Sequence, residues 1–228
     1  MRRALADTVQ WWGRNRHAIL FALLIATIAM GPLLSVTGSG GWLLNASLGL
    51  TLLAAAVAPT RDRVRRRGLL VLAVAAIVLG LAPIRTGFGE TGPLTLALWS
   101  AIAFVAATRS FRYAMSSARV DREHLLAGLN TYLLVGVFFG AIWVAMEKAM
   151  PRSLLLGGAP IDAMVLPDGI YFSFVTLASL GYGDFTPATP IARGLAVFEV
   201  VFGQLYLAIM VARLVSLRIA VLARDDPP

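Results

Sequence analysis

The sequence predicts an all-α membrane protein with six transmembrane helices and a re-entrant segment, and three observations support this fold class. Hydrophobic residues make up 58% of the 228 residues and charged residues only 14%, with a mean hydropathy of +0.78. A soluble domain carries about 25% charged residues, so a soluble enzyme is excluded. Charged residues are missing from four long stretches, 17–60, 68–84, 91–108 and 124–146. Basic residues are concentrated on one side of the predicted membrane domain.

Six apolar segments are long enough to cross a bilayer, for which roughly 20 residues of helix are needed. The glycine-rich segment 38–41 divides the first stretch into two spans. The spans are expected at about 18–37, 42–58, 68–84, 93–108, 124–146 and 190–215. The third and fourth are short, and flanking arginines can reach the membrane interface to make up the difference.

Residues 168–184 form an apolar segment of another kind. Fifteen residues separate its terminal aspartates, Asp168 and Asp184, which is too few to cross the bilayer. Such a segment enters the membrane and returns on the same side, provided that protein or water satisfies its backbone.

Arginine and lysine residues are distributed unevenly between the loops, and this predicts the orientation. Of the 20, 16 fall on the side of the two termini, and the other four are Arg85, Lys148, Arg152 and Arg193. The positive-inside rule therefore places both termini in the cytoplasm. The loop between the second and third spans is also a candidate contact for anionic lipid, although orientation alone explains its arginines: Arg61, Arg63, Arg65, Arg66 and Arg67.

Several kinds of chemistry are not expected. The absence of cysteine excludes disulfides and thiolate metal sites. The two histidines, His17 and His124, are far apart in the sequence, so a histidine metal site is not expected. No cofactor and no nucleic-acid partner is predicted. A transporter or membrane enzyme would need paired ionisable groups inside the spans, which the sequence lacks.

The segment Thr176-Leu-Ala-Ser-Leu-Gly-Tyr-Gly-Asp184 resembles the selectivity filter of potassium channels. The resemblance covers less than half of the chain and implies a pore domain over 113–218 and a homotetramer around a central pore. Its parts would be an outer helix at 124–147, a pore helix at 168–178, a filter at 179–183 and an inner helix at 190–217. The remaining parts are expected to be a cytoplasmic N-terminal segment, 1–17, a four-helix membrane domain, 18–112, and a short cytoplasmic tail, 219–228.

The residue types in this segment suit ion coordination. Backbone carbonyls can replace the water that a potassium ion sheds, and the carbonyls expected to do so belong to Ser179, Leu180, Gly181 and Tyr182. Gly181 and Gly183 adopt the required backbone angles without a Cβ penalty. Leu180 and Tyr182 are expected to point outward and brace the filter against the pore helix, and Asp184 is expected at the outer mouth, where its charge concentrates cations. Ser179 and Leu180 stand where the family usually has threonine and valine, and an ordinary tight turn remains the structural alternative.

The last span resembles the inner helix of that family. Gly203 falls where the family often has a hinge glycine, and close helix packing is the alternative. The residues expected to line the cavity and inner gate are Gly203, Gln204, Leu207, Val211 and Val215. Glu199 is expected behind the filter together with Thr176, hydrogen bonded to a hydroxyl of Ser173 or Thr176, since a carboxyl inside a span seldom faces lipid. Gly136 and Gly140 form a GxxxG pair, for which packing is expected.

A voltage sensor is not expected, because the fourth span carries no arginine before Arg109 and Arg112 at its cytoplasmic end. The sequence therefore predicts a potassium-selective channel that conducts passively, is not strongly voltage-gated and lies in a bacterial inner membrane. The alternative is a nonconducting or regulatory membrane subunit that keeps the pore fold. Neither function is enzymatic.

Overall fold

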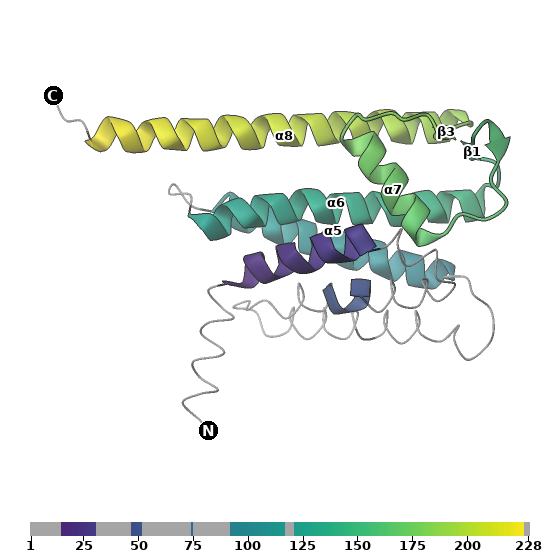
Figure 1. Ribbon diagram of the computed structural model, residues 1–228, viewed down its shortest axis with the longest axis horizontal. Helices are drawn as coiled ribbons and strands as arrows, with labels where there is room; N and C mark the ends of the chain where they lie inside the picture. The colour runs from purple at the N-terminus through teal and green to yellow at the C-terminus, as the bar shows by residue number, and fades with distance from the viewer. Residues whose placement is uncertain (1–14, 31–46, 52–73, 75–91, 117–120, 226–228) are drawn as a thin grey trace, which may run out of the picture.

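The computed structural model describes residues 15–30, 47–51, 74, 92–116 and 121–225 of the chain, drawn as coloured ribbon in Figure 1. The described part is mostly helical. Its main helices are Asn15–Met30, α5 (Pro93–Ala114), α6 (Arg122–Ala149), α7 (Leu166–Leu177) and α8 (Pro190–Asp225). Three short strands complete it: β1 (Leu154–Leu156), β2 (Ala159–Pro160) and β3 (Phe185–Pro187).

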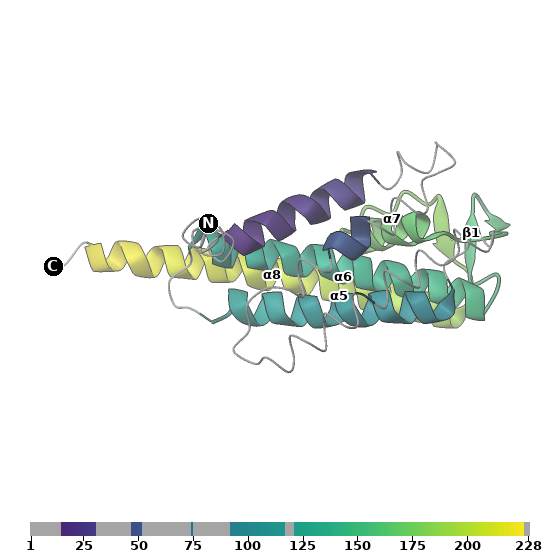
Figure 2. The same cartoon turned by 90° about the horizontal axis from the view of Figure 1, so that it is seen from below.

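The helices form a bundle in which α6 occupies the middle (Figure 1). The helix α5 runs along α6 in both views (Figures 1 and 2), and α8 runs along the opposite side. At one end, the short helix α7 crosses obliquely between α6 and α8, and the three strands lie beyond it. The chain after α7 therefore returns to the end of the bundle where α7 began, as predicted for a re-entrant segment.

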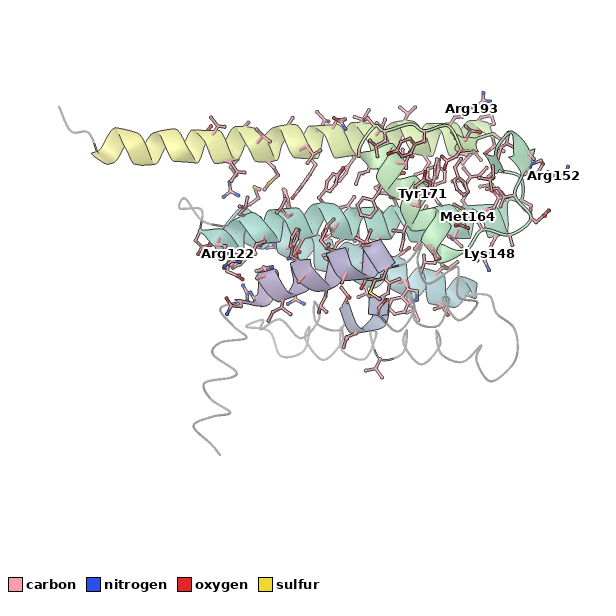
Figure 3. The ribbon with its side chains drawn as sticks, in the orientation of Figure 1. Arg122, Lys148, Arg152, Met164, Tyr171 and Arg193 are labelled. Atoms are coloured by element: carbon pink, nitrogen blue, oxygen red, sulfur yellow. The ribbon has the colours of Figure 1, made fainter. Side chains whose placement is uncertain are left out.

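Basic residues mark the two ends of this bundle. Figure 3 shows Arg122 at one end of α6 and Lys148 at the other, with Arg152 and Arg193 at the same end of the bundle as Lys148. Three of the four cations assigned to the outer side thus lie at one end of the bundle. The fourth, Arg85, lies outside the described residues, as do the five arginines of the loop at 61–67.

Two described helices are long and apolar enough to cross a membrane, namely α6 and the segment Pro190–Ser216 of α8. The fourth expected span, 93–108, corresponds to α5, which continues to Ala114. The first and second expected spans are described only over 15–30 and 47–51, and the third only at Val74. The prediction of six spans is therefore tested only in part.

Three of the helix boundaries that differ from those expected have a local reason in the sequence. The helix α6 starts at Arg122 because the Asp121 carboxylate accepts the backbone N–H of His124 at 2.9 Å and caps it. The pore helix expected at 168–178 begins at Leu166, since Pro167 is well suited to the first helical turn.

The third difference is a correction at the C-terminus. The inner helix expected at 190–217 continues as α8 to Asp225, so most of the segment 219–228 expected as a tail is helical. No glycine occurs between Gly203 and the proline at 227, so the sequence carries no strong helix breaker there.

Close packing of α6 on α7 depends on glycines. A Cβ added to Gly140 would lie 2.7 Å from the Ile170 Cα, and one added to Gly136 would lie 2.6 Å from the Phe174 ring. Gly169 of α7 in turn contacts the carbonyl of Gly140. The prediction that the GxxxG pair serves packing is confirmed.

Polar groups join the N-terminal helix to the rest of the bundle. His17 and His124 both stack on the Tyr113 ring, each with centroids 4.6 Å apart. The Asn130 amide donates to the His17 carbonyl at 2.9 Å, and the His17 N–H donates to Glu123 at 3.1 Å. His17, placed by the sequence in a cytoplasmic segment, is therefore a buried helical residue that stacks on the same tyrosine ring as His124 of α6.

One face of α8 packs on the other helices of the chain, and the remaining surface is exposed. Glu199, Gly203, Tyr206 and Met210 are buried along this face. The Tyr206 hydroxyl donates to the Gly128 carbonyl of α6 at 2.6 Å. In the most apolar window of α8 only 17% of the residues are buried, against 61% for α6. An apolar helix so exposed requires lipid or protein to cover it.

Candidate selectivity filter and its support

The C-terminus of α7 leads directly into the segment 179–183. The Ser179 N–H donates to the Thr176 carbonyl and the Leu180 N–H donates to the Val175 carbonyl, both at 2.9 Å. These two bonds define a Schellman motif, which ends a helix with one residue in the left-handed conformation. That residue is Ser179, with φ of 58°. The first filter residue is therefore also the cap of the pore helix.

The sign of φ alternates through this segment. Ser179, Gly181 and Gly183 have φ of 58°, 60° and 81°, whereas Leu180 and Tyr182 have negative φ. Alternation of positive and negative φ turns successive peptide groups, so that like atoms can gather on one side of the chain. An ordinary tight turn needs one or two residues of positive φ, not three in alternation. The segment therefore differs from an ordinary tight turn.

The side chains of the segment point away from the body of the chain. Leu180 is 56% exposed and Tyr182 is 67% exposed. The expectation that both brace the filter against the pore helix concerns an assembled channel, and in the single chain neither side chain is buried. A groove of about 400 Å³ lies beside the filter, lined by residues of α7, the filter, β3 and α8.

Asp184 is held at the end of the filter by three hydrogen bonds. Its carboxylate accepts from the Tyr171 hydroxyl of α7 at 2.7 Å and from the Phe185 N–H at 2.9 Å. Its carbonyl accepts from the Gly157 N–H at 2.8 Å. The Tyr171 hydroxyl is the main reason why the pKa of Asp184 lies below its ordinary value. Asp184 is partly exposed beyond Gly183, and the sequence offered no sign of its bond to Tyr171.

A small antiparallel sheet supports this end of the filter. The strand β1 pairs with β2 on one side and with β3 on the other. Gly157 and Gly158 join β1 to β2 with φ of 59° and 84°, which is typical of a two-residue type I′ turn. Since β3 follows Asp184 directly, the sheet ties the exit of the filter to the segment after α6. None of these strands was predicted.

A buried carboxylate anchors the sheet to α6. Glu147 is 5% exposed and accepts the backbone N–H groups of Arg152 at 2.6 Å and Leu154 at 2.9 Å. These bonds fix Arg152 with φ of 70° just before β1. From the sequence, Glu147 could be interpreted only as a charge at the end of a span. Its role in holding the segment before β1 was not predicted.

Glu199 lies between three helices behind the filter. It is fully buried, and its Oε1 accepts from the Ser173 hydroxyl of α7 at 2.5 Å. Its Oε2 accepts from the Trp143 indole of α6 at 2.7 Å. Of the two expected hydroxyl partners, Ser173 makes the contact. Thr176 is half-buried, lines the groove beside the filter and contributes its carbonyl to the Schellman motif.

A second contact between α8 and α7 lies one turn further along. Gly203 is buried against the Leu177 carbonyl, where a Cβ would clash. The Gln204 amide donates to the same carbonyl at 3.4 Å. For Gly203 the packing alternative therefore has a physical basis in the structure. The other predicted cavity residues, Leu207, Val211 and Val215, are exposed on α8.

Comparison with known proteins agrees with this geometry. Residues 131–218, from α6 to α8, match a family model described as an ion channel. The two pore potassium channel c of rice, Oryza sativa subsp. japonica, is 34% identical over 93 residues, which are 41% of this chain and 18% of the relative. The chain thus matches less than a fifth of the relative's length. No solved structure matches the chain.

Residues 131–218 of the chain are therefore similar to an ion channel domain. Two of the described helices are long and apolar enough to cross a membrane, which agrees with this similarity.

Proposed function

We propose that this chain is one subunit of a potassium-selective channel that conducts passively through residues 179–183. The single observation that carries the proposal is the alternation of φ sign from Ser179 to Gly183, at the end of a short helix held between two apolar helices. A turn or a packing site does not need this backbone. Similarity to a potassium channel over 93 residues supports the same function.

The ligands of the ion in this proposal are the backbone carbonyls of Ser179, Leu180, Gly181 and Tyr182. Potassium is the transported substrate, and no cofactor is involved. Carbonyl oxygens replace the water that the ion sheds on entering the filter. Asp184 at the outer mouth adds a negative charge that raises the local cation concentration.

The proposed channel is a homotetramer, and the exposure of the filter supports its assembly from several chains. One chain supplies one strand, which cannot surround an ion alone. Leu180 and Tyr182 are more than half exposed, and the groove beside the filter is lined partly by apolar residues such as Val175 and Val197. Four copies arranged around a central axis would bring filter side chains of one subunit against the groove of the next. The exposed surface of α8 would be covered by neighbours, lipid and the cavity.

The proposed channel lies in a bacterial inner membrane with both termini in the cytoplasm. The separation of Arg122 from Lys148, Arg152 and Arg193 along the bundle supports this orientation (Figure 3). Residues 18–112 act in this proposal as a membrane domain without voltage sensing, and the five arginines at 61–67 contact anionic lipid.

Potassium flux into liposomes that contain the purified chain tests the function. Gly181→Ala should reduce the flux at least a hundredfold and leave the tetramer intact, because a left-handed alanine costs about 1–2 kcal/mol per subunit and turns the carbonyl away. Gly158→Ala is the matched control, since Gly158 also has positive φ and open space around its Cβ position. This control should conduct normally. Normal potassium-over-sodium selectivity in Gly181→Ala would overturn the filter assignment, and wild-type protein without flux would favour the nonconducting subunit.

A further inference from the structure

Two polar residues of α8 contact α7 in complementary ways. Glu199 presents two acceptor oxygens and receives the Ser173 hydroxyl at 2.5 Å. Gln204 presents a donor, which reaches the Leu177 carbonyl at 3.4 Å. One contact lies in the middle of α7 and the other at its last residue. Together they fix both the position of α7 along α8 and its rotation about its own axis.

The contact at Leu177 completes the C-terminus of the helix. An α-helix leaves its last four carbonyls without partners inside the helix. In α7 three of them receive backbone N–H groups: Phe174 from Ala178, Val175 from Leu180 and Thr176 from Ser179. The fourth belongs to Leu177 and receives the Gln204 amide. Two of the three backbone donors are filter residues.

The filter is thereby connected to α8 through α7, which hydrogen bonds to Glu199 on one side and to the first filter residues on the other. Ser173 lies two residues before Val175 and three before Thr176, whose carbonyls hold the N–H groups of Leu180 and Ser179. A rotation of α7 on α8 would move these carbonyls and change the backbone angles at the start of the filter. The Trp143 indole attaches the same carboxyl to α6, so Glu199 is fixed on two sides.

We propose that Glu199 and Gln204 are positioning residues of the selectivity filter, which hold the pore helix through one acceptor and one donor. This inference rests on the proposed function of the segment 179–183 as a filter. Neither residue touches the ion in this account, and both act through α7. The partners of Glu199 belong to the same subunit, so the mechanism operates within each chain.

The chemistry of the two partners of Glu199 predicts which substitutions are accepted. An indole N–H can only donate, whereas a serine hydroxyl can donate or accept. In Glu199→Gln the amide oxygen can accept from Trp143 while the amide nitrogen donates to Ser173. Both contacts survive. Glu199→Leu fills a similar volume and loses both, so a comparison of the two variants separates hydrogen bonding from packing.

The test combines sodium and potassium permeability with hydrogen exchange of the filter. Permeability ratios are measured from reversal potentials in planar bilayers with purified wild-type protein and the variants Glu199→Gln, Glu199→Leu, Gln204→Leu and Ser173→Ala. We expect Glu199→Leu to raise the sodium-to-potassium ratio at least tenfold and Glu199→Gln to stay within twofold of wild type. Asp162→Asn is the control for replacing a carboxylate with an amide, because Asp162 is exposed outside the site.

Hydrogen exchange of the amides in residues 176–184 gives a readout that does not need conduction. The exchange rate should rise at least fivefold in Glu199→Leu and stay unchanged in Glu199→Gln. Adding Ser173→Ala to Glu199→Leu should have no further effect, since both remove the same bond. Should Glu199→Leu fail to assemble, Gln204→Leu and Ser173→Ala each remove a single contact and give the same readouts.

The outcomes separate the two proposals. If Glu199→Leu assembles and keeps both the wild-type exchange rate and the wild-type permeability ratio, the positioning role is overturned. It is also overturned if Glu199→Gln changes these two quantities as much as Glu199→Leu does. A wild-type protein that carries no potassium, with exchange that still follows the predicted order, would contradict the proposed function and keep the positioning role of Glu199.

Discussion

Ser179 combines two tasks that favour different residues. As the cap of α7 it has φ of 58°, where glycine is the usual residue. As the first residue of the proposed filter it would contribute a hydroxyl beside its carbonyl. Its left-handed conformation costs about 1 kcal/mol relative to glycine. The sequence showed the serine but could not show this conformation, because the Schellman motif depends on where α7 ends.

Substitution at Ser179 should separate these tasks. Ser179→Gly should raise the stability of the assembly by about 1 kcal/mol per subunit, because glycine adopts positive φ freely. Ser179→Val should lower it, since a branched side chain is disfavoured there. Thermal unfolding of the purified protein in detergent measures both effects. Equal unfolding temperatures for the glycine and valine variants would contradict the conformation assigned to Ser179.

Asp184 gives a prediction for pH. The Tyr171 hydroxyl lowers the pKa of Asp184 in the folded protein, so the contact stabilises the fold above the ordinary pKa of about 3.9. This contribution is lost as the pH falls through the lowered pKa. Wild type should therefore lose thermal stability below about pH 4, and Tyr171→Phe should lose less over the same range. Parallel curves of unfolding temperature against pH for the two proteins would refute this role of Tyr171.

At the scale of elements, the contact between α6 and α7 depends on the absence of side chains. Gly140→Ala would place a Cβ 2.7 Å from the Ile170 Cα, where backbone atoms cannot easily move aside. We expect a loss of about 1–3 kcal/mol per subunit, measured by thermal unfolding. Gly194→Ala is the control on α8, because its Cβ position has open space among the described residues. Equal effects of the two substitutions would show that the α6–α7 contact is not tight.

The elements differ in how far the sequence could predict them. The span at 124–146 was predictable from a long apolar run and the pore helix from the resemblance of the segment 176–184 to a filter. Only their ends shifted, because the effects of Asp121 as a cap and of Pro167 in the first turn are local. The sheet of β1, β2 and β3 was not predictable. Its strands are two or three residues long, too short for a pattern of alternation, and it is held by Glu147, whose burial depends on a loop fold.

At the scale of the whole molecule, the distribution of charge predicts the response to voltage. One charge moved through the full field gains about 2.3 kcal/mol per 100 mV, so steep gating needs several charges within the membrane. In α5 the basic residues Arg109 and Arg112 lie only near the end. Open probability should therefore depend weakly on voltage in planar bilayers. Steep activation that disappears when Arg109 and Arg112 are both neutralised would disprove this prediction.

The direction of α7 has an electrical consequence beyond its hydrogen bonds. A helix carries about half a negative elementary charge at its C-terminus, and α7 ends at the filter. Four such helices in the proposed tetramer would place about two negative charges near the inner end of the filter. Rejection of anions would then be separate from the choice among cations. The Glu199→Leu assembly should admit sodium and still exclude chloride, which a reversal potential measured in a potassium chloride gradient can establish.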